Sequence, residues 1–214
     1  LINMLYNIVD RMYIGHIKDV GSLALTGVGV CMPLILIVSA FAALIGSGGA
    51  PKASIAMGQK EIKKAEEILG NCFSMQIVIS VILTVILGLF SGTLLRAFGA
   101  SENTIGYAVD YMNIYALGTL FVELTLGMNM FITAQGFART GMLSVMIGAA
   151  VNIILDPIFI FGLGMGVKGA ALATVLSQAV SCVWVLSFLF GKKTFLRIRK
   201  ENLKLKSGVI LPCM

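Results

Sequence analysis

Residues 20–51 read VGSLALTGVGVCMPLILIVSAFAALIGSGGAP, a stretch with no charged side chain. A helix of roughly 20 apolar residues crosses the hydrocarbon core of a bilayer, so this stretch is long enough for one membrane span. Four later stretches are also uncharged or hold a single acidic residue: 68–95, 111–138, 140–167 and 169–191. The pattern predicts a polytopic membrane protein.

The composition of the 214 residues excludes a soluble globular domain. Hydrophobic residues make up 58% of the chain and charged residues 12%, and the mean hydropathy is +0.96. Such a chain has too few polar groups to cover a water-facing surface. We predict an all-α protein with six transmembrane helices, at about 1–17, 25–48, 70–94, 110–134, 141–163 and 169–190.

The apolar stretches at the two ends are short. The first begins with Leu1 and is short for a full crossing, so we expect the outer part of a truncated first helix. Residues 207–214 turn apolar after a basic segment, as the start of a truncated seventh helix would. Residues 1–206 are then expected to form one lobe of six helices, in a chain cut at both ends.

Lysine and arginine collect on the cytoplasmic side of membrane proteins, and here they segregate between alternate connections. Twelve fall on one side: Lys52, Lys60, Lys63, Lys64, Arg139, Lys192, Lys193, Arg197, Arg199, Lys200, Lys204 and Lys206. Lys18, Arg96 and Lys168 fall on the other side, and Arg11 lies within the first span. We expect a plasma-membrane protein. Its connections near 51–69, 135–140 and 191–206 are expected to face the cytoplasm.

The connection at 51–69 combines apolar residues at helical spacing with charged ones. We expect a solvated linker helix that lies along the cytoplasmic interface. The basic segment 191–206 is expected to be a simple connector.

Several classes of function are excluded or disfavoured. The net charge of +6 reports orientation in a membrane protein and does not indicate nucleic acid. The four cysteines, Cys31, Cys72, Cys182 and Cys213, have no paired or CxxC spacing, so no disulfide or zinc site is expected. His16 is the single histidine, and no HExxH, GxSxG or GxxxxGK[ST] motif occurs. We expect no enzyme and no cofactor, with an intramembrane aspartyl protease that uses Asp10 and Asp156 as the remaining enzymatic alternative.

Three acidic residues fall inside the predicted spans and away from their ends: Asp10, Glu123 and Asp156. An ionisable group in a membrane is costly and generally marks a functional site. Asn152 lies four residues before Asp156, so both side chains share one helical face. Pro157 has no N–H, which leaves the carbonyl of Ile153 without its helical partner. A carboxylate, an amide oxygen and a free carbonyl together suit a hard cation or a proton.

Other polar residues of the spans could complete such a site. Thr174 and Gln178 are four residues apart on the last span and would complete an oxygen cage if they face Asp156. Asp10 is followed by Arg11, but adjacent residues on a helix diverge by about 100°, which makes a direct ion pair poor.

The polar groups of the fourth span remain open to more than one interpretation. Glu123 is either protonated and hydrogen-bonded to a neighbouring helix or directed into a wet substrate cavity, and Asn129 faces another direction. Tyr107, Tyr111 and Tyr115 repeat every four residues near the outer end of that span, which is typical of an interfacial aromatic stripe.

Four motifs occur in a fixed order: YNIVDRMYIG at 6–15, LTGVG at 25–29, AQG at 134–136 and NIILDPIFIFG at 152–162. With this ordered set the chain resembles the multidrug and toxic compound extrusion (MATE) family, and within it the DinF- and MepA-like branch. The resemblance covers nearly all of the chain. It implies the N-terminal six-helix lobe of an antiporter that exports cationic, amphipathic drugs or metabolites in exchange for Na⁺ or H⁺, paired with a C-terminal six-helix lobe.

The same resemblance implies the site residues. By position, Asp10, Asn152, Asp156 and Thr174 match the residues of the family that bind Na⁺ or a proton. Glu123, Asn129 and Gln178 are the residues we expect at a substrate cavity. The expected partners are the lipid bilayer, small cationic substrates and the second lobe.

Two alternatives share the predicted architecture. A lipid-linked oligosaccharide flippase of the same superfamily would favour a cationic cavity over intramembrane carboxylates. A membrane channel or scaffold without ion coupling would have no need of the buried acids.

Overall fold

The computed structural model describes residues 2–17, 20–191 and 193–203. These ranges contain helices and no strand, which confirms the all-α prediction. The helices are α1 (Ile2–Gly15), α2 (Gly21–Gly58), α3 (Ile62–Ala97), α4 (Ile105–Ala134), α5 (Ala138–Pro157) and α6 (Val167–Phe190), with a π-helical turn at Ile158–Gly162 and a 3₁₀ turn at Lys200–Asn202.

The expected spans at 25–48, 70–94, 110–134 and 169–190 each fall within one longer helix. The span at 141–163 covers most of α5 and the π-helical turn, and the span at 1–17 extends beyond both ends of α1. The five helices from α2 to α6 are long and apolar enough to cross a membrane. The helix α1 has 14 residues, fewer than a crossing requires, so a sixth crossing remains a prediction. The expected seventh helix at 207–214 lies outside the described residues.

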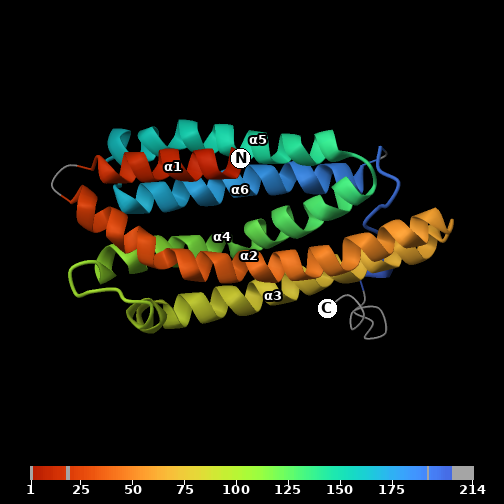
Figure 1. Cartoon of the computed structure of the whole chain (residues 1–214), viewed down its shortest axis with the longest axis horizontal. Coiled ribbons are helices and arrows are strands. Elements are labelled where there is room, and N and C mark those ends of the chain that lie inside the picture. Colours follow the sequence, from red (N-terminus) through yellow and green to blue (C-terminus); the bar gives the residue numbers. More distant parts are fainter. Residues whose placement is uncertain (1, 18–19, 192, 204–214) are drawn as a thin grey trace.

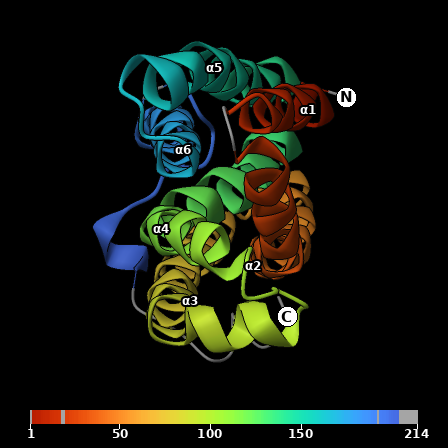
Figure 2. The ribbon, with the colours of Figure 1, turned by 90° about the vertical axis from the view of Figure 1, so that its left-hand side faces the viewer.

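The helices run roughly along one direction, with α4 in the middle of the bundle. Figures 1 and 2 show α2 and α3 on one side of α4, and α1, α5 and α6 on the other. In α4, 61% of the most apolar segment is buried, against 33% or less in the other four long helices. A buried centre with apolar side chains on the outer faces, such as Leu89 at 75% and Leu117 at 72% exposure, is the arrangement of a multi-pass membrane protein.

Small residues allow the helices to pack closely, as is common inside membranes. A Cβ atom on Gly46 of α2 would lie 3.1 Å from the Cα of Gly127 on α4. A Cβ on Gly169 of α6 would lie 2.7 Å from the backbone of Phe159 in the π-helical turn. Larger residues at these two positions would push apart the elements that carry the candidate site.

The prediction of a separate linker helix at 51–69 is wrong. The helix α2 continues through Pro51 to Gly58, and after a turn in which Lys60 has a φ of 64° the helix α3 begins at Ile62. Figure 1 shows this hairpin extending beyond the ends of the other helices. Ile55 and Ile62 of the segment are exposed. Its other apolar residues belong to one buried cluster between α2 and α3, which includes Ala53, Ala56, Ala65, Ile68 and Leu69.

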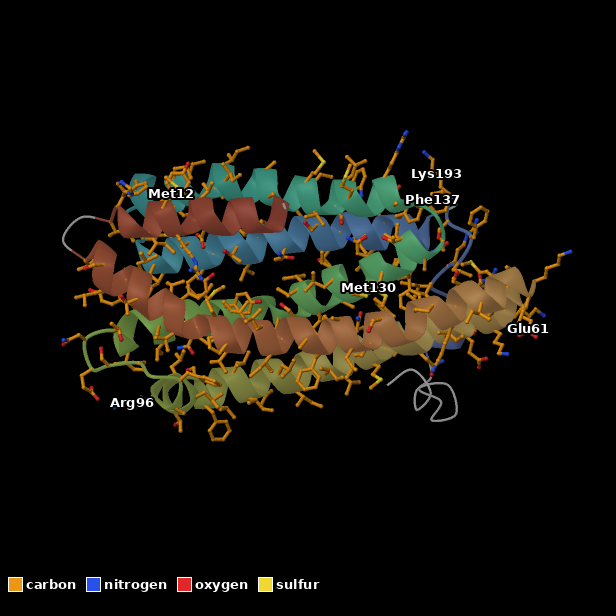
Figure 3. All side chains as sticks on the ribbon, in the orientation of Figure 1. Met12, Glu61, Arg96, Met130, Phe137 and Lys193 are labelled. Atoms are coloured by element: carbon orange, nitrogen blue, oxygen red, sulfur yellow. The ribbon has the colours of Figure 1, made fainter. Side chains whose placement is uncertain are left out.

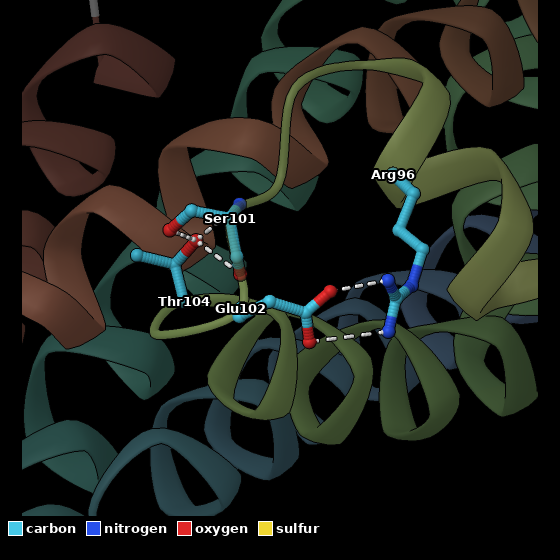
Figure 4. Close-up of polar contacts among 4 residues, drawn as sticks. All are labelled: Arg96, Ser101, Glu102 and Thr104. Carbon is cyan, nitrogen blue, oxygen red and sulfur yellow. Dashed lines mark hydrogen bonds and ion pairs between the residues drawn. The ribbon is translucent and has the colours of Figure 1, made fainter.

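The opposite end of the bundle carries the α3–α4 turn. Arg96 pairs with Glu102 at 2.5 Å, and the backbone N–H of Ser101 donates to the Thr104 hydroxyl at 3.0 Å (Figure 4). Figure 3 shows Arg96 at this end and both Glu61 and Lys193 at the other. The turn therefore fixes where α4 enters the bundle, and α4 carries several of the candidate residues.

Candidate cation site

Two acidic residues that are far apart in the sequence meet inside the bundle. Asp10 of α1 is 7% exposed, and Asp156 in the last turn of α5 is fully buried. The two carboxyl groups lie close enough for their charges to interact. The packing of α1 along α5 therefore creates a pair of buried carboxyl groups.

The local sequence explains why the chain turns at this point. Pro157 has no N–H, so the carbonyl of Ile153 loses its α-helical partner, and the chain changes to a π-helical turn in which the Leu163 N–H donates to the Ile158 carbonyl at 2.8 Å. Tyr13 of α1 packs edge-to-face on Phe161 of this turn, with ring centroids 6.2 Å apart. This aromatic contact holds α1, and with it Asp10, beside the end of α5.

The oxygens of this pair are incompletely satisfied. The Asn152 amide donates to Asp156 Oδ1 at 3.2 Å, as the four-residue spacing indicates. Within the described part of the chain, Asp10 Oδ1, Asn152 Oδ1 and Asp156 Oδ2 are buried and have no hydrogen-bond partner. Each buried polar atom without a partner costs about 1–3 kcal/mol, so the arrangement is suited to a bound cation or proton.

Tyr111 is a site residue that the sequence interpretation missed. Its side chain lies beside Thr174 and close enough to Asp10 for the two groups to interact electrostatically. Tyr111 and Tyr115 are buried and stacked, with centroids 6.3 Å apart, so the prediction that these two belong to an interfacial stripe is wrong. A four-residue repeat keeps to one face of a helix, and this face of α4 is covered by neighbouring helices. The sequence gives no sign of that enclosure.

A cavity of about 220 Å³ adjoins the carboxyl pair. Its polar lining comes from Asp10, Arg11, Tyr111, Tyr115, Thr174, Ser177, Gln178 and other small polar residues. Asn152 and Asp156 do not line this cavity, so Asp10 connects it to the more deeply buried oxygens. The volume is below the roughly 300–1,000 Å³ of sites for drug-sized ligands and suits water and small ions.

Arg11 does not neutralise Asp10 by direct pairing. Its side chain is exposed at the edge of the cavity, and none of the ion pairs among the described residues includes Asp10. This agrees with the expectation from helix geometry.

A second, more open hollow lies between α2, α4 and α5. Its volume is about 670 Å³, and its lining includes Asn129, Met130, Thr133 and Met142; Figure 3 labels Met130. The Asn129 amide donates to the Gly141 carbonyl at 3.1 Å and to the Ser144 hydroxyl at 2.9 Å. We call this hollow the groove.

The cavity and the groove share a wall. Leu126 of α4 and Val145 of α5 line both of them. A movement of α5 against α4 would therefore change both hollows.

The three residues expected at a substrate cavity lie in three different places. Gln178 lines the cavity, and Asn129 lines the groove. Glu123 is fully buried inside the bundle and lines neither. Across residues 2–17, 20–191 and 193–203, no three His, Cys, Asp or Glu side chains gather as a metal cluster.

Known proteins with sequences similar to this chain include multidrug exporters. The chain is 29% identical over 204 residues to the "Multidrug export protein MepA" of Staphylococcus haemolyticus (strain JCSC1435), covering 95% of the chain and 45% of that protein. It is 25% identical over 205 residues to the MepA protein of Staphylococcus aureus (strain NCTC 8325 / PS 47), covering 96% and 44%. The chain thus spans about half the length of the curated relatives that it matches.

Solved structures give the same result. The fold matches an inward-facing and an outward-facing "multidrug resistance MATE family transporter of the MOP superfamily", each with a TM-score of 0.90 and 26% identity, over 98% and 99% of the chain and 47% of each structure. It also matches a MOP superfamily transporter from Pyrococcus furiosus Vc1, whose description reads "Reverse polarity of binding pocket suggests different function", with a TM-score of 0.90 and 26% identity over 99% of the chain and 46% of that structure.

The family assignment rests on a direct match to the greater part of the chain. Residues 1–158, which include both buried carboxyl groups, match the model of the family described as MatE. The chain therefore belongs to the MatE family, whose members are membrane transporters and not enzymes.

Proposed function

We propose that this chain carries the coupling-ion site of an antiporter that exports cationic, amphipathic drugs or metabolites in exchange for Na⁺ or H⁺. One observation carries the proposal: Asp10, Asn152 and Asp156 each hold a buried oxygen without a partner among the described residues. Two neighbouring carboxylates repel each other at low dielectric, and a bound cation or proton removes that repulsion.

The oxygen ligands for the ion would come from three helices. Asp10 lies on α1, Asn152 and Asp156 lie on α5, and Thr174 lies on α6. Carboxylate, amide and hydroxyl oxygens suit a hard cation, and the carboxyl pair also suits a shared proton. In this proposal Tyr111 positions the Thr174 hydroxyl.

Coupling requires two states with different affinities for ion and substrate. When the ion binds, the repulsion between Asp10 and Asp156 falls and α1 packs more firmly against α5. Because Leu126 and Val145 line both hollows, the same movement would reshape the groove, where we place the substrate. Its methionines, Met130 and Met142, adapt to flat apolar ligands of different shapes.

The remaining half of the transporter would be a second lobe. The fold has the same TM-score of 0.90 against an inward-facing and an outward-facing transporter, which supports a lobe that moves largely as one body. We propose that this chain is the N-terminal lobe, that it pairs with a C-terminal lobe of six helices, and that the connections near 51–69, 135–140 and 191–206 face the cytoplasm from the plasma membrane.

A flippase for lipid-linked oligosaccharides is the second candidate. The similarity to the transporter of Pyrococcus furiosus, described as having a pocket of reversed polarity, favours keeping it. Such a protein would need a cationic cavity, whereas Arg11 is the one cationic side chain in the described lining of the cavity and the groove has none.

The experiment that tests the proposal is transport by the native gene product that carries this chain, reconstituted in proteoliposomes. A Na⁺ gradient and a pH gradient, imposed separately, should each be tested for their ability to drive export of a fluorescent cationic dye. The proposal predicts that one of them drives export and that Asp156→Asn stops it. Dye movement that ignores both gradients would contradict it.

A further inference from the structure

Glu123 is a fully buried acid that the candidate cation site does not use. It lies on α4, lines neither hollow, and has no hydrogen-bond partner for Oε1 or Oε2 within the described ranges. Outside the cation site, Oε1 of Gln76 on α3 and Oγ1 of Thr119 on α4 are also fully buried and without a partner there. These three side chains are the subject of the inference.

Helix geometry places all three together. Thr119, Glu123 and Gly127 are four residues apart, so they share one face of α4. A Cβ on Gly127 would collide with the Gln76 amide, which means that this amide fills the space where a side chain at 127 would be. A helical side chain covers the turn that precedes its own residue. The Gln76 amide takes the place of a side chain at 127, so it lies over the turn that begins at Glu123.

The register of α3 against α4 agrees with this placement. The Thr84 hydroxyl donates to the Ala116 carbonyl at 3.0 Å, and Gln76 lies on Gly127. Because the two helices are antiparallel neighbours, these contacts put Glu123 level with the turn between Gln76 and Ser80. The side-chain amide N–H of Gln76 donates to the Ala42 carbonyl of α2 at 3.5 Å. The oxygen of the same amide remains as an acceptor.

No described cationic side chain is placed to balance a charge at Glu123. The cations of the four helices packed on α4 lie near the helix ends: Lys52, Lys63, Lys64, Arg96, Arg139 and Lys168. Two of these helices carry a thiol near this part of α4. Cys72 of α3 packs at Gly49 of α2, and Cys182 of α6 interacts with Thr125. From α2, the residues that meet this part of α4 and the Gln76 amide are Ala42 and Gly46.

We propose that Glu123 and Gln76, with Thr119, form a second proton-binding site, in which the neutral carboxyl of Glu123 donates its hydrogen to the amide oxygen of Gln76. A bound proton supplies the donor that the carboxyl oxygens of Glu123 and the amide oxygen of Gln76 lack, and it avoids an uncompensated buried charge, which would be very costly. The site joins α4 to α3 and is separate from the carboxyl pair of α1 and α5.

The test is infrared spectroscopy of the reconstituted native gene product at neutral pH, in Na⁺-free and Na⁺-containing buffers. The stretching band of protonated carboxyl groups should lose a component in Glu123→Gln. The same loss is expected when Asp10→Asn and Asp156→Asn are also present. Glu66→Gln is the matched control, because Glu66 is also buried but is paired with Arg199 at 2.9 Å, and it should leave the band unchanged.

Two results would overturn the inference. One is a carboxyl band that Glu123→Gln does not change, and the other is a Glu123 component that disappears when Na⁺ is added, which would indicate a sodium site. If Glu123→Gln does not fold, Gln76→Leu gives the same information, because loss of the acceptor should shift the Glu123 component to higher frequency. An unshifted component in Gln76→Leu would contradict the pairing.

Discussion

The carboxyl groups of Asp10 and Asp156 lie close enough for their charges to interact, although one lies on the short first helix and the other on the last turn of α5. The contact depends on Pro157, which ends α5, and on the packing of Tyr13 against Phe161. A buried pair of this kind without a cation between its members is unfavourable. The account of the lobe as an ion-coupled unit rests on this pair.

Asn152→Leu should weaken binding of the coupling ion by about tenfold or more, because a hydrogen bond to a charged group contributes about 1.5–3 kcal/mol. The measurement is the ion concentration that gives half-maximal transport. Asn71→Leu is the control: Asn71 is another buried asparagine that donates to a helix carbonyl, that of Glu67, at 2.9 Å. Equal effects of the two changes would contradict a specific role for Asn152.

Tyr111→Phe should weaken ion binding several-fold with the fold intact, because it removes the hydroxyl that we propose positions Thr174 and leaves the ring in place. A neutral hydrogen bond contributes about 0.5–1.5 kcal/mol. Tyr107→Phe, one turn earlier and outside the cavity lining, is the comparison. If both variants bind the ion like the unchanged protein, Tyr111 does not belong to the site.

Gln135→Leu should release the segment that follows α6. Gln135 Oε1 accepts hydrogen bonds from the Thr194 hydroxyl at 2.7 Å and from the N–H groups of Phe195 at 3.0 Å and Leu196 at 2.9 Å. Three such bonds are worth about 3 kcal/mol, so hydrogen exchange at 194–198 should accelerate by about a hundredfold. Gln59→Leu, at the exposed end of α2, should leave this exchange unchanged, and protection retained in Gln135→Leu would show that other contacts hold the segment.

Gly127→Ala should destabilise the bundle by about 1–3 kcal/mol, the usual cost of overpacking a core, because the added methyl group collides with the Gln76 amide. Thermal unfolding in detergent measures this. Gly88→Ala is the matched control on α3, since a Cβ there meets no atom within 4 Å and alanine favours a helix over glycine. If Gly127→Ala is as stable as Gly88→Ala, the Gln76 amide does not occupy the space beside Gly127.

The positions of the helices could be predicted because charges are excluded from the interior of a membrane, which makes the uncharged stretches visible in the sequence. The Asn152–Asp156 pair was also predictable, because both residues lie on one helix with a fixed spacing. The contact of Asp156 with Asp10 was not, since it depends on how α1 packs against α5. Tyr111 was misinterpreted for the same reason: its surroundings are set by helices distant in sequence.

The hairpin of α2 and α3 illustrates another limit. Pro51 and the charges that follow it look like the end of a membrane span, and the helix nevertheless continues to Gly58. Proline is tolerated within long membrane helices when neighbouring groups satisfy the freed carbonyl. The local sequence therefore predicts that 51–69 is largely helical, but it does not predict where these residues lie in the fold.

The measurement that tests the central claim most directly is export of a fluorescent cationic dye by the reconstituted native gene product, with Na⁺ and pH gradients imposed separately and Asp156→Asn as the variant. The account predicts export driven by one of the two gradients in the unchanged protein and no gradient-driven export in Asp156→Asn, with equal amounts of protein in the membrane. Gradient-driven export that persists in Asp156→Asn would contradict the role assigned to the Asp10–Asp156 pair.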